Sequence, residues 1–304
     1  MRVGLDIGGT KTAAVVVDSS GVVTQELVLP TGYGADAVVQ TAVAAVTELG
    51  RLTGQAPSDF ESIGIGIPGV VEADTGRVSH AVNLGLRGLE LGARLEAALG
   101  TRVFVENDVN AAAVAAFHRV GTASSQSMAY LNLGTGLAAG LILDGRLWRG
   151  SRGTAGEVGH IPIDPNGPLC TCGQRGCLET VASGSAVARL WPTDHPRPVQ
   201  ALFDAAAAGD PRAITIAGDL VENIAAAVRV LVLTIDVDIV VIGGGLSSLG
   251  DPLLQSVRAV FTRWSTTSPF IASLDLDERV RLLPERFDAA AVGAALIGIA
   301  GQLA

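Results

Sequence analysis

Near the start of the chain stands the run Leu5-Asp6-Ile7-Gly8-Gly9-Thr10-Lys11, an apolar strand pattern that ends in a glycine turn. A second run of this kind, Leu131-Asn132-Leu133-Gly134-Thr135-Gly136, occurs in the middle of the chain. In both copies a hydrophobic strand leads into a Gly/Thr turn and then into a second strand, which reaches Asp18 in one copy and Asp144 in the other. The shared order predicts two lobes related by duplication, each opening with a β-hairpin.

The segments around these two runs alternate between strand and helix patterns. In the first half we expect strands at 3–7, 13–18, 22–29, 62–67 and 102–105, and helices near 35–49 and 89–99, with a further helix from Asp108. In the second half we expect an irregular stretch at 150–184, helices near 199–208 and 212–233, a strand at 238–242 and a helix after Asp288. Such alternation is typical of an α/β fold.

The bulk composition favours a globular protein with two lobes. The chain has 304 residues, of which 48% are hydrophobic and 17% charged, so it is long for one compact core and rich in material for an interior. A net charge of −9 without any basic run argues against a nucleic-acid partner.

The sequence also argues against export and against a membrane span. No ordered set of charged, apolar and cleavage regions opens the chain, so we expect a cytoplasmic protein. The most membrane-like stretch, 289–300, is shorter than the roughly 20 apolar residues that a span requires. We interpret it as a buried helix.

The first glycine turn has the chemistry of a phosphate site. Its glycines let backbone N–H groups approach an anion, while Thr10 and Lys11 offer a hydroxyl and an ammonium group. Asp6 could hold a magnesium ion, directly or through water. The run lacks the order of a Walker loop and of a dinucleotide fingerprint, so an ordinary hairpin remains the alternative. The turn 134–136 would suit another phosphate if the two lobes face each other.

Two other strand ends carry candidate residues. Glu106-Asn107-Asp108 stands where a strand ends and a helix opens, so Asn107 or Asp108 could cap the helix. The carboxyl ends of strands also present ligand-binding groups in open α/β sheets, so a carboxylate there could act on a ligand. The glycines of 243–245 follow an apolar strand and would let backbone pack against a ring or a phosphate, although many turns of this kind contain glycine.

The cysteines predict a metal site. All three fall within residues 170–177, and an odd, clustered set in a chain without an export signal indicates metal ligation rather than disulfides. With one histidine they make a His plus Cys₃ set, typical of a closed, structural zinc site with no catalytic water. The predicted ligands are His160, Cys170, Cys172 and Cys177. Zinc would fix His160 and the flanking Glu157 and Glu179.

Taken together, these residues resemble the bacterial ROK family of sugar kinases over essentially the whole chain. The resemblance rests on the turn 6–11, on Glu106-Asn107-Asp108 with Asn110, on Gly156-Glu157-Val158-Gly159-His160, and on the cysteine signature from Cys170 to Glu179. It implies an actin-like ATPase (ribonuclease H-like) α/β fold, with two lobes around a central cleft. ATP would lie between the paired turns and the sugar deeper in the hinge cleft.

The resemblance also implies residue roles. Asp108 matches the catalytic base. The sugar-binding positions are Gly69, Asn83, Asn107, Asp108, Glu157, His160 and Glu179. The nucleotide-binding positions are Asp6, Gly8, Gly9, Thr10, Lys11, Gly134, Thr135, Gly136, Gly243, Gly244 and Gly245. Asn132 departs from the pattern, because many members carry an acid there, and this leaves metal positioning at the second turn open.

The expected activity is ATP- and Mg²⁺-dependent phosphorylation of a hexose at its 6-hydroxyl, with glucose as acceptor and N-acetylglucosamine or N-acetylmannosamine as the alternatives. We predict a smaller N-terminal lobe at 1–118, onto which a C-terminal helix at about 288–304 packs back. The larger lobe spans 119–287 and contains the zinc-binding segment 160–177. A homo-oligomer, dimer or tetramer, is expected, with no nucleic-acid or membrane partner.

Two other functions compete with this one. Some members of the family are sugar-sensing regulators with an N-terminal helix-turn-helix, for which a phosphate turn that begins at Asp6 leaves no room. A non-catalytic sugar-binding protein is the other, and the joint presence of Asp6, Lys11 and Asp108 argues against it. The sequence leaves open the sugar, the oligomeric state and whether another phosphoryl donor, such as polyphosphate, replaces ATP.

Overall fold

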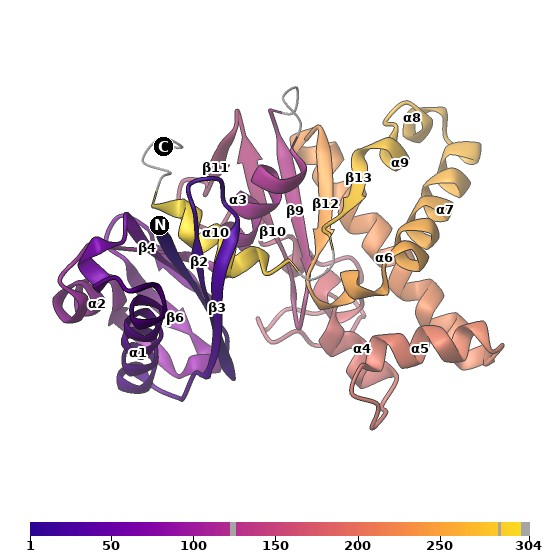
Figure 1. The fold of residues 1–304 in the computed structure, drawn as a ribbon. Helices are drawn as coiled ribbons and strands as arrows, with labels where there is room; N and C mark the ends of the chain where they lie inside the picture. The colour runs from indigo at the N-terminus through magenta and orange to yellow at the C-terminus, as the bar shows by residue number, and fades with distance from the viewer. Residues whose placement is uncertain (122–125, 285–286, 299–304) are drawn as a thin grey trace. The chain divides into compact units, whose positions relative to one another are not determined.

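The computed structural model describes residues 1–121, 126–284 and 287–298 (Figure 1). Backbone contacts divide the chain into two compact units. The first unit comprises Met1–Thr122, Gly140–Ala155 and Asp288–Ala304, and the second comprises Ala123–Ala139 and Gly156–Phe287. The lobe boundaries given from the sequence, 1–118 and 119–287, stay a prediction.

The first sheet contains the opening hairpin. Its strands are β1 (Arg2–Ile7), β2 (Lys11–Val17), β3 (Val23–Pro30), β4 (Ser62–Ile67) and β8 (Val103–Asn107). They lie in the order β3-β2-β1-β4-β8. The first three form the predicted antiparallel meander, while β4 pairs parallel with both β1 and β8.

The second sheet repeats this order. Its strands are β9 (Met128–Leu133), β10 (Leu137–Leu143), β11 (Arg146–Trp148), β12 (Ile239–Gly243) and β13 (Val280–Leu282), arranged β11-β10-β9-β12-β13. As in the first sheet, the strand before the turn pairs parallel with a later strand, β12, which in turn pairs parallel with β13. The duplicated hairpin predicted from the sequence is confirmed, and the duplication extends to five strands.

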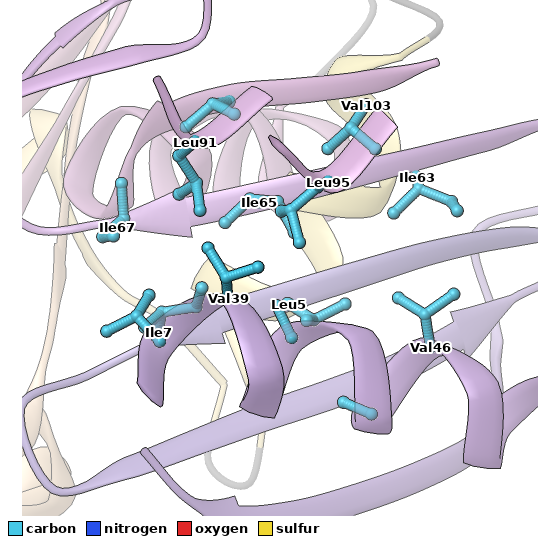
Figure 2. Close-up of a cluster of buried hydrophobic side chains, with 14 of the residues drawn as sticks. Leu5, Ile7, Val39, Val46, Ile63, Ile65, Ile67, Leu91, Leu95 and Val103 are labelled. Carbon is cyan, nitrogen blue, oxygen red and sulfur yellow. The ribbon is translucent and has the colours of Figure 1, made fainter. Parts of the chain in front are cut away.

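One face of the first sheet is covered by α1 (Ala35–Thr53) and α2 (Leu91–Leu99). Side chains alternate between the two faces of a strand, so Leu5 and Ile7 of β1 point to the same side. Figure 2 shows them in a cluster of buried aliphatic side chains with Val39 of α1 and Leu95 of α2. The core is built from Val, Ile and Leu, as the scarcity of aromatic residues requires.

The other face is covered by α10 (Ala289–Ile297), which also packs against α3 (Asp108–Val120). Glycines allow the close approach. A Cβ on Gly4 would lie 2.0 Å from the Ala291 carbonyl oxygen, and one on Gly293 would lie 1.7 Å from the Ala111 carbonyl oxygen. The helix predicted at about 288–304 is confirmed as far as Ile297, and residues 299–304 lie outside the described part of the chain.

A small sheet was not predicted. It consists of β5 (Val70–Glu72), β6 (Arg77–Ala81) and β7 (Leu86–Glu90), paired antiparallel in chain order. The helix expected near 89–99 therefore begins later, at Leu91. Leu89 and Glu90 belong to β7 because they pair with Val78 and Arg77 of the neighbouring strand.

The second unit carries most of the remaining helices. They are α4 (Gly184–Leu190), α5 (Pro198–Ala207), α6 (Pro211–Ile235), α7 (Asp251–Thr267), α8 (Pro269–Ala272) and α9 (Leu276–Arg279). The predicted irregular stretch at 150–184 is confirmed: it contains only the short 3₁₀ turns η3 (Val158–His160) and η4 (Leu178–Thr180) and isolated bridges. Among the described residues no helix combines the length and hydropathy needed to cross a membrane.

Candidate functional site

Asp108, the predicted base, is the first residue of α3, and Asn107 caps that helix. The Asn107 side-chain oxygen accepts hydrogen bonds from the backbone N–H groups of Val109 and Asn110, at 3.0 and 3.1 Å. Its Nδ2 donates to the Gly69 carbonyl oxygen at 3.1 Å. The predicted capping role is thus filled by Asn107. Two predicted sugar-binding positions, Gly69 and Asn107, lie in contact.

Beneath this turn lies the carboxylate of Glu106, which is 2% exposed. Its Oε1 accepts from the Asn107 backbone N–H and from Asn110 Nδ2, both at 2.9 Å. Its Oε2 accepts from Arg149 Nε at 2.7 Å. The motif in the sequence pointed to the first three of these residues. Nothing pointed to Arg149, because it comes from a chain segment far from the motif.

Asp6 is the next-to-last residue of β1 and lies on the face of the sheet that α10 covers. Burial raises the pKa of its carboxyl to about 7, and the negative charges of Asp108 and Asp288 add to the effect while Lys11 opposes it. Asp288 also caps α10, accepting from the Ala291 N–H at 3.2 Å. The sequence indicated Asp288 only as a helix start, so its proximity to Asp6 is a structural finding.

The first glycine turn is a tight hairpin. The Gly8 N–H donates to the Lys11 carbonyl oxygen at 2.9 Å, and the Thr10 carbonyl oxygen accepts from the Thr31 N–H at 3.1 Å. A Cβ on Gly9 would lie 3.5 Å from Asn83 Cβ. Asn83, predicted to bind sugar, therefore stands beside the turn predicted to bind phosphate.

The second turn is braced by its own neighbours. Its Gly134 N–H donates to the Gly136 carbonyl oxygen at 3.1 Å. The Thr135 carbonyl oxygen accepts from Ser185 Oγ at 2.7 Å. Just after the turn, the Leu137 N–H donates to Glu179 Oε2 at 2.9 Å. Glu179, predicted to bind sugar, thus already uses one carboxylate oxygen to hold the second turn.

The glycines of 243–245 lie against the strand that leads into the second turn. Gly244 has a φ of +81°, and a Cβ there would lie 2.6 Å from Asn132 Oδ1. Only glycine fits both the conformation and the space. The second phosphate turn and the glycine run, predicted separately, are therefore neighbours on one unit.

The four predicted metal ligands come together. The ligand atoms of His160, Cys170, Cys172 and Cys177 lie within 4.8 Å of one another. The Cys172 and Cys177 sulfurs are 3.6 Å apart, and Cys170 Sγ lies 3.7 Å from His160 Nδ1. Bonds of about 2.3 Å to a tetrahedral zinc would put two sulfurs roughly 3.8 Å apart, so the cluster fits such an ion.

Two thiols of this cluster have pKa values shifted in opposite directions. Burial raises the pKa of the Cys177 thiol to about 12, whereas the Gln174 N–H lowers that of Cys172 to about 7. A metal ion would hold all three sulfurs as thiolates. Since His160 Nδ1 faces the sulfurs, its Nε2 points elsewhere and lies 3.9 Å from Glu157 Oε2. One imidazole can therefore face a metal ion and a second partner.

The predicted site residues divide between the two units. The first unit holds Asp6, Gly8, Gly9, Thr10, Lys11, Gly69, Asn83, Asn107 and Asp108. The second holds Gly134, Thr135, Gly136, Glu157, His160, Cys170, Cys172, Cys177, Glu179, Gly243, Gly244 and Gly245.

Known proteins resemble this chain over nearly its whole length. Residues 2–300 match the ROK family. A glucokinase of Halalkalibacterium halodurans is 34% identical over 86% of this chain and 86% of its own length. An N-acetylmannosamine kinase of Salmonella arizonae is 31% identical over 96% of each chain.

A solved structure of a ROK family protein also matches this chain over nearly its whole length. The crystal structure of a ROK family glucokinase from Streptomyces griseus, in complex with glucose and AMPPNP, superposes with a TM-score of 0.79 at 32% identity, covering 97% of this chain and 98% of that one. The resemblance noted from the sequence is confirmed in both family and fold, and the actin-like ATPase architecture applies to this chain. The chain belongs to the ROK family.

Proposed function

We propose that this protein is an ATP-dependent hexose kinase that transfers the γ-phosphoryl group to the 6-hydroxyl of glucose. The observation that carries the proposal is the Asn107–Asp108 turn, where a carboxylate is fixed at a helix start by a capping side chain. The glucokinase relative and the glucose- and AMPPNP-bound ROK structure support the choice of sugar and donor.

In the mechanism we infer, Asp108 accepts the proton of the attacking hydroxyl. Lys11 and the N–H groups of the two glycine turns offset the negative charge of the transferring group. Asp6 is the residue that would hold a magnesium ion, which would supply positive charge to offset that of the phosphates. Exclusion of water from the site protects the phosphoryl group from hydrolysis.

Sugar recognition would use side chains whose orientation the structure already restricts. The Asn107 oxygen caps α3, so this amide would meet a sugar hydroxyl as a donor. Glu179 keeps one oxygen on the Leu137 N–H, so the other would accept from the sugar. His160 would present Nε2. A site built from such fixed groups rejects sugars that leave them unpaired.

We infer that the His/Cys₃ cluster holds a structural zinc ion. All four positions would be filled by protein, which leaves no position for a catalytic water. Its contribution would be to fix His160 and the nearby Glu179.

We further propose a cytoplasmic homo-oligomer. The free cysteines, clustered as candidate metal ligands, support the location. Light scattering of the purified protein would give the assembly, and a monomer at micromolar concentration would refute it.

The test of the proposed function is a measurement of kcat/KM with Mg·ATP for glucose, mannose, N-acetylglucosamine and N-acetylmannosamine. Glucose should give the highest value, with the phosphate on its 6-hydroxyl. Repeating the glucose assay with polyphosphate tests the donor. Absence of turnover with every sugar would refute the kinase.

N-acetylmannosamine is the second candidate substrate, because the relative that phosphorylates this sugar, by its name, aligns over more of the chain than the glucokinase. If an N-acetyl sugar exceeds glucose tenfold, about 1.4 kcal/mol of transition-state preference, the acceptor is wrong and the kinase stands.

A further inference from the structure

Arg149 supplies the positive charge that pairs with the buried carboxylate of Glu106, next to the Asn107–Asp108 turn. This residue follows β11, and its carbonyl oxygen accepts from the Ala155 N–H at 3.2 Å. Its guanidinium Nε lies 2.7 Å from Glu106 Oε2. The side chain of Arg149 is 33% exposed and that of Glu106 only 2%, so the ion pair links a partly exposed side chain to a buried one.

A carboxylate as buried as that of Glu106 needs compensation. Two of its donors, the Asn107 N–H and Asn110 Nδ2, are neutral, and both bind Oε1. Arg149 provides the positive charge and binds Oε2. Its removal would leave a buried carboxylate without a charged partner, and such a group turns toward water or takes up a proton.

Reorientation or protonation of Glu106 would disturb the residues around Asp108, the proposed base. Oε1 holds the backbone on one side of Asp108 through Asn107, and it holds the side chain of Asn110 on the other. Asn107 in turn caps α3 and binds the Gly69 carbonyl oxygen. The contacts therefore run without interruption from Arg149 through Glu106 to the turn that carries Asp108.

We propose that Arg149 is a positioning residue for phosphoryl transfer, acting through Glu106 on the Asn107–Asp108 turn. The proposal rests on the proposed kinase function and adds a residue to it. Arg149 touches neither substrate nor phosphate in this role. It fixes the orientation of the base, and a displacement of about 1 Å at such a group can reduce a rate by about 10².

The experiment is a double-mutant cycle with Arg149→Met, Glu106→Gln and the combined variant. Each single change should reduce kcat with glucose by about 10- to 100-fold and leave KM for ATP within about twofold. Because Arg149 acts through Glu106, the combined variant should be no more than about twofold slower than the slower single variant. Arg149→Lys, which can still reach the carboxylate as a point charge, should recover most of the activity.

Arg146→Met on β11 is the matched control, because Arg146 is exposed and outside this network. It should keep the activity of the original protein. Circular dichroism would give the folded fraction, to which each rate is normalised. If Arg149→Met alone does not fold, the combined variant and Arg149→Lys carry the test, since neither leaves an unpaired buried charge.

Two results would overturn the proposal: multiplicative effects in the combined variant, or a normalised kcat for Arg149→Met equal to that of the original protein. The proposed kinase function fails separately, when the unmodified protein phosphorylates no sugar.

Discussion

Asp108 carries the most direct prediction at the scale of single residues. Asp108→Asn should keep the fold, since the amide oxygen can still accept from the Val109 N–H that Asp108 Oδ1 now binds. Loss of the general base should lower kcat by roughly 10² to 10⁴. Steady-state kinetics and calorimetry with glucose would separate catalysis from binding. Near-normal turnover by the purified variant would remove Asp108 from the mechanism.

The raised pKa of Asp6, the proposed magnesium ligand, makes the stability of the fold depend on pH. Its pKa is raised from 3.8 to about 7, so the folded protein binds this proton more tightly than the unfolded chain does. Stability is therefore lost as the pH rises from near 4 to 7, and above pH 7 the full cost is present. At about 1.4 kcal/mol per pH unit, this cost is on the order of 1 to 4 kcal/mol.

We expect Asp6→Asn to raise the free energy of unfolding by that amount at pH 8 without magnesium or nucleotide, and by less than half as much at pH 5. Its kcat should fall, because the magnesium ligand is lost. Urea titrations at the two pH values make the comparison. Equal stability of variant and original protein at pH 8 would show that ionised Asp6 does not destabilise the fold.

Which site residues the sequence could reveal depended on their spacing along the chain. The metal ligands and the Asn107–Asp108 turn stand in short motifs whose residues fold next to each other. Asp288 acts on Asp6 and Arg149 acts on Glu106, each from a distant segment, and only the pairing of strands and helices brings them there. Their residue types alone gave no signal, because Asp at a helix start and Arg after a strand are common.

At the scale of elements, we predict that the short turn η4 couples the His/Cys₃ cluster to the second glycine turn. η4 begins just after Cys177 and carries Glu179, whose Oε2 holds the Leu137 N–H behind the turn. Cys172→Ser should prevent binding of the proposed zinc ion, one per chain in the original protein, and raise KM for glucose. It should also weaken binding of an ATP analogue, because Glu179 no longer braces the turn.

Metal analysis of protein purified without chelator, followed by calorimetry with the analogue, would test this. Thr171→Ser is the control, since Thr171 is exposed between two ligands and is not one itself. Full nucleotide affinity in zinc-free Cys172→Ser protein would separate the turn from the cluster.

Helix α10 gives a second prediction about elements. Gly293→Ala would drive a methyl group into the backbone of α3, where the Ala111 oxygen lies 1.7 Å from the Cβ position. We expect a loss of about 1 to 3 kcal/mol from overpacking. Gly218→Ala, in an exposed position of α6 with nothing within 4 Å, should instead stabilise by about 0.5 to 1 kcal/mol. Thermal unfolding of both variants checks the opposite signs, and equal shifts would contradict the close packing.

Long elements were easier to predict than short ones. The helices α1 and α6 and the buried strands β1 and β4 have enough periodic residues to reveal their type. The strands of the small sheet have three to five residues each. Leu89, in β7, fits the helical pattern of α2 equally well, so only pairing with β6 decides where it belongs.

At the scale of the whole molecule, the hairpin repeated in the sequence is only part of a larger structural repeat. The two sheets share all five positions in their strand order, although the repeat identified in the sequence covers only the hairpins. Strand order depends on which segments are apolar and how they connect, and many different apolar side chains meet that requirement. The assignment of 140–155 to the first unit had no counterpart in the sequence, because no local pattern marks it.

The discontinuity of the first unit also has a consequence for biosynthesis. The last strand of its sheet, β8, leaves the ribosome well before α10, which covers one face of that sheet and follows β13 in the chain. Nascent chains arrested before Asp288 should therefore be cleaved by protease within residues 1–121, and chains long enough to expose α10 should resist. Equal resistance at both lengths would contradict this order. Until α10 has emerged, the unit that carries Asp108 would depend on chaperones to shield its sheet.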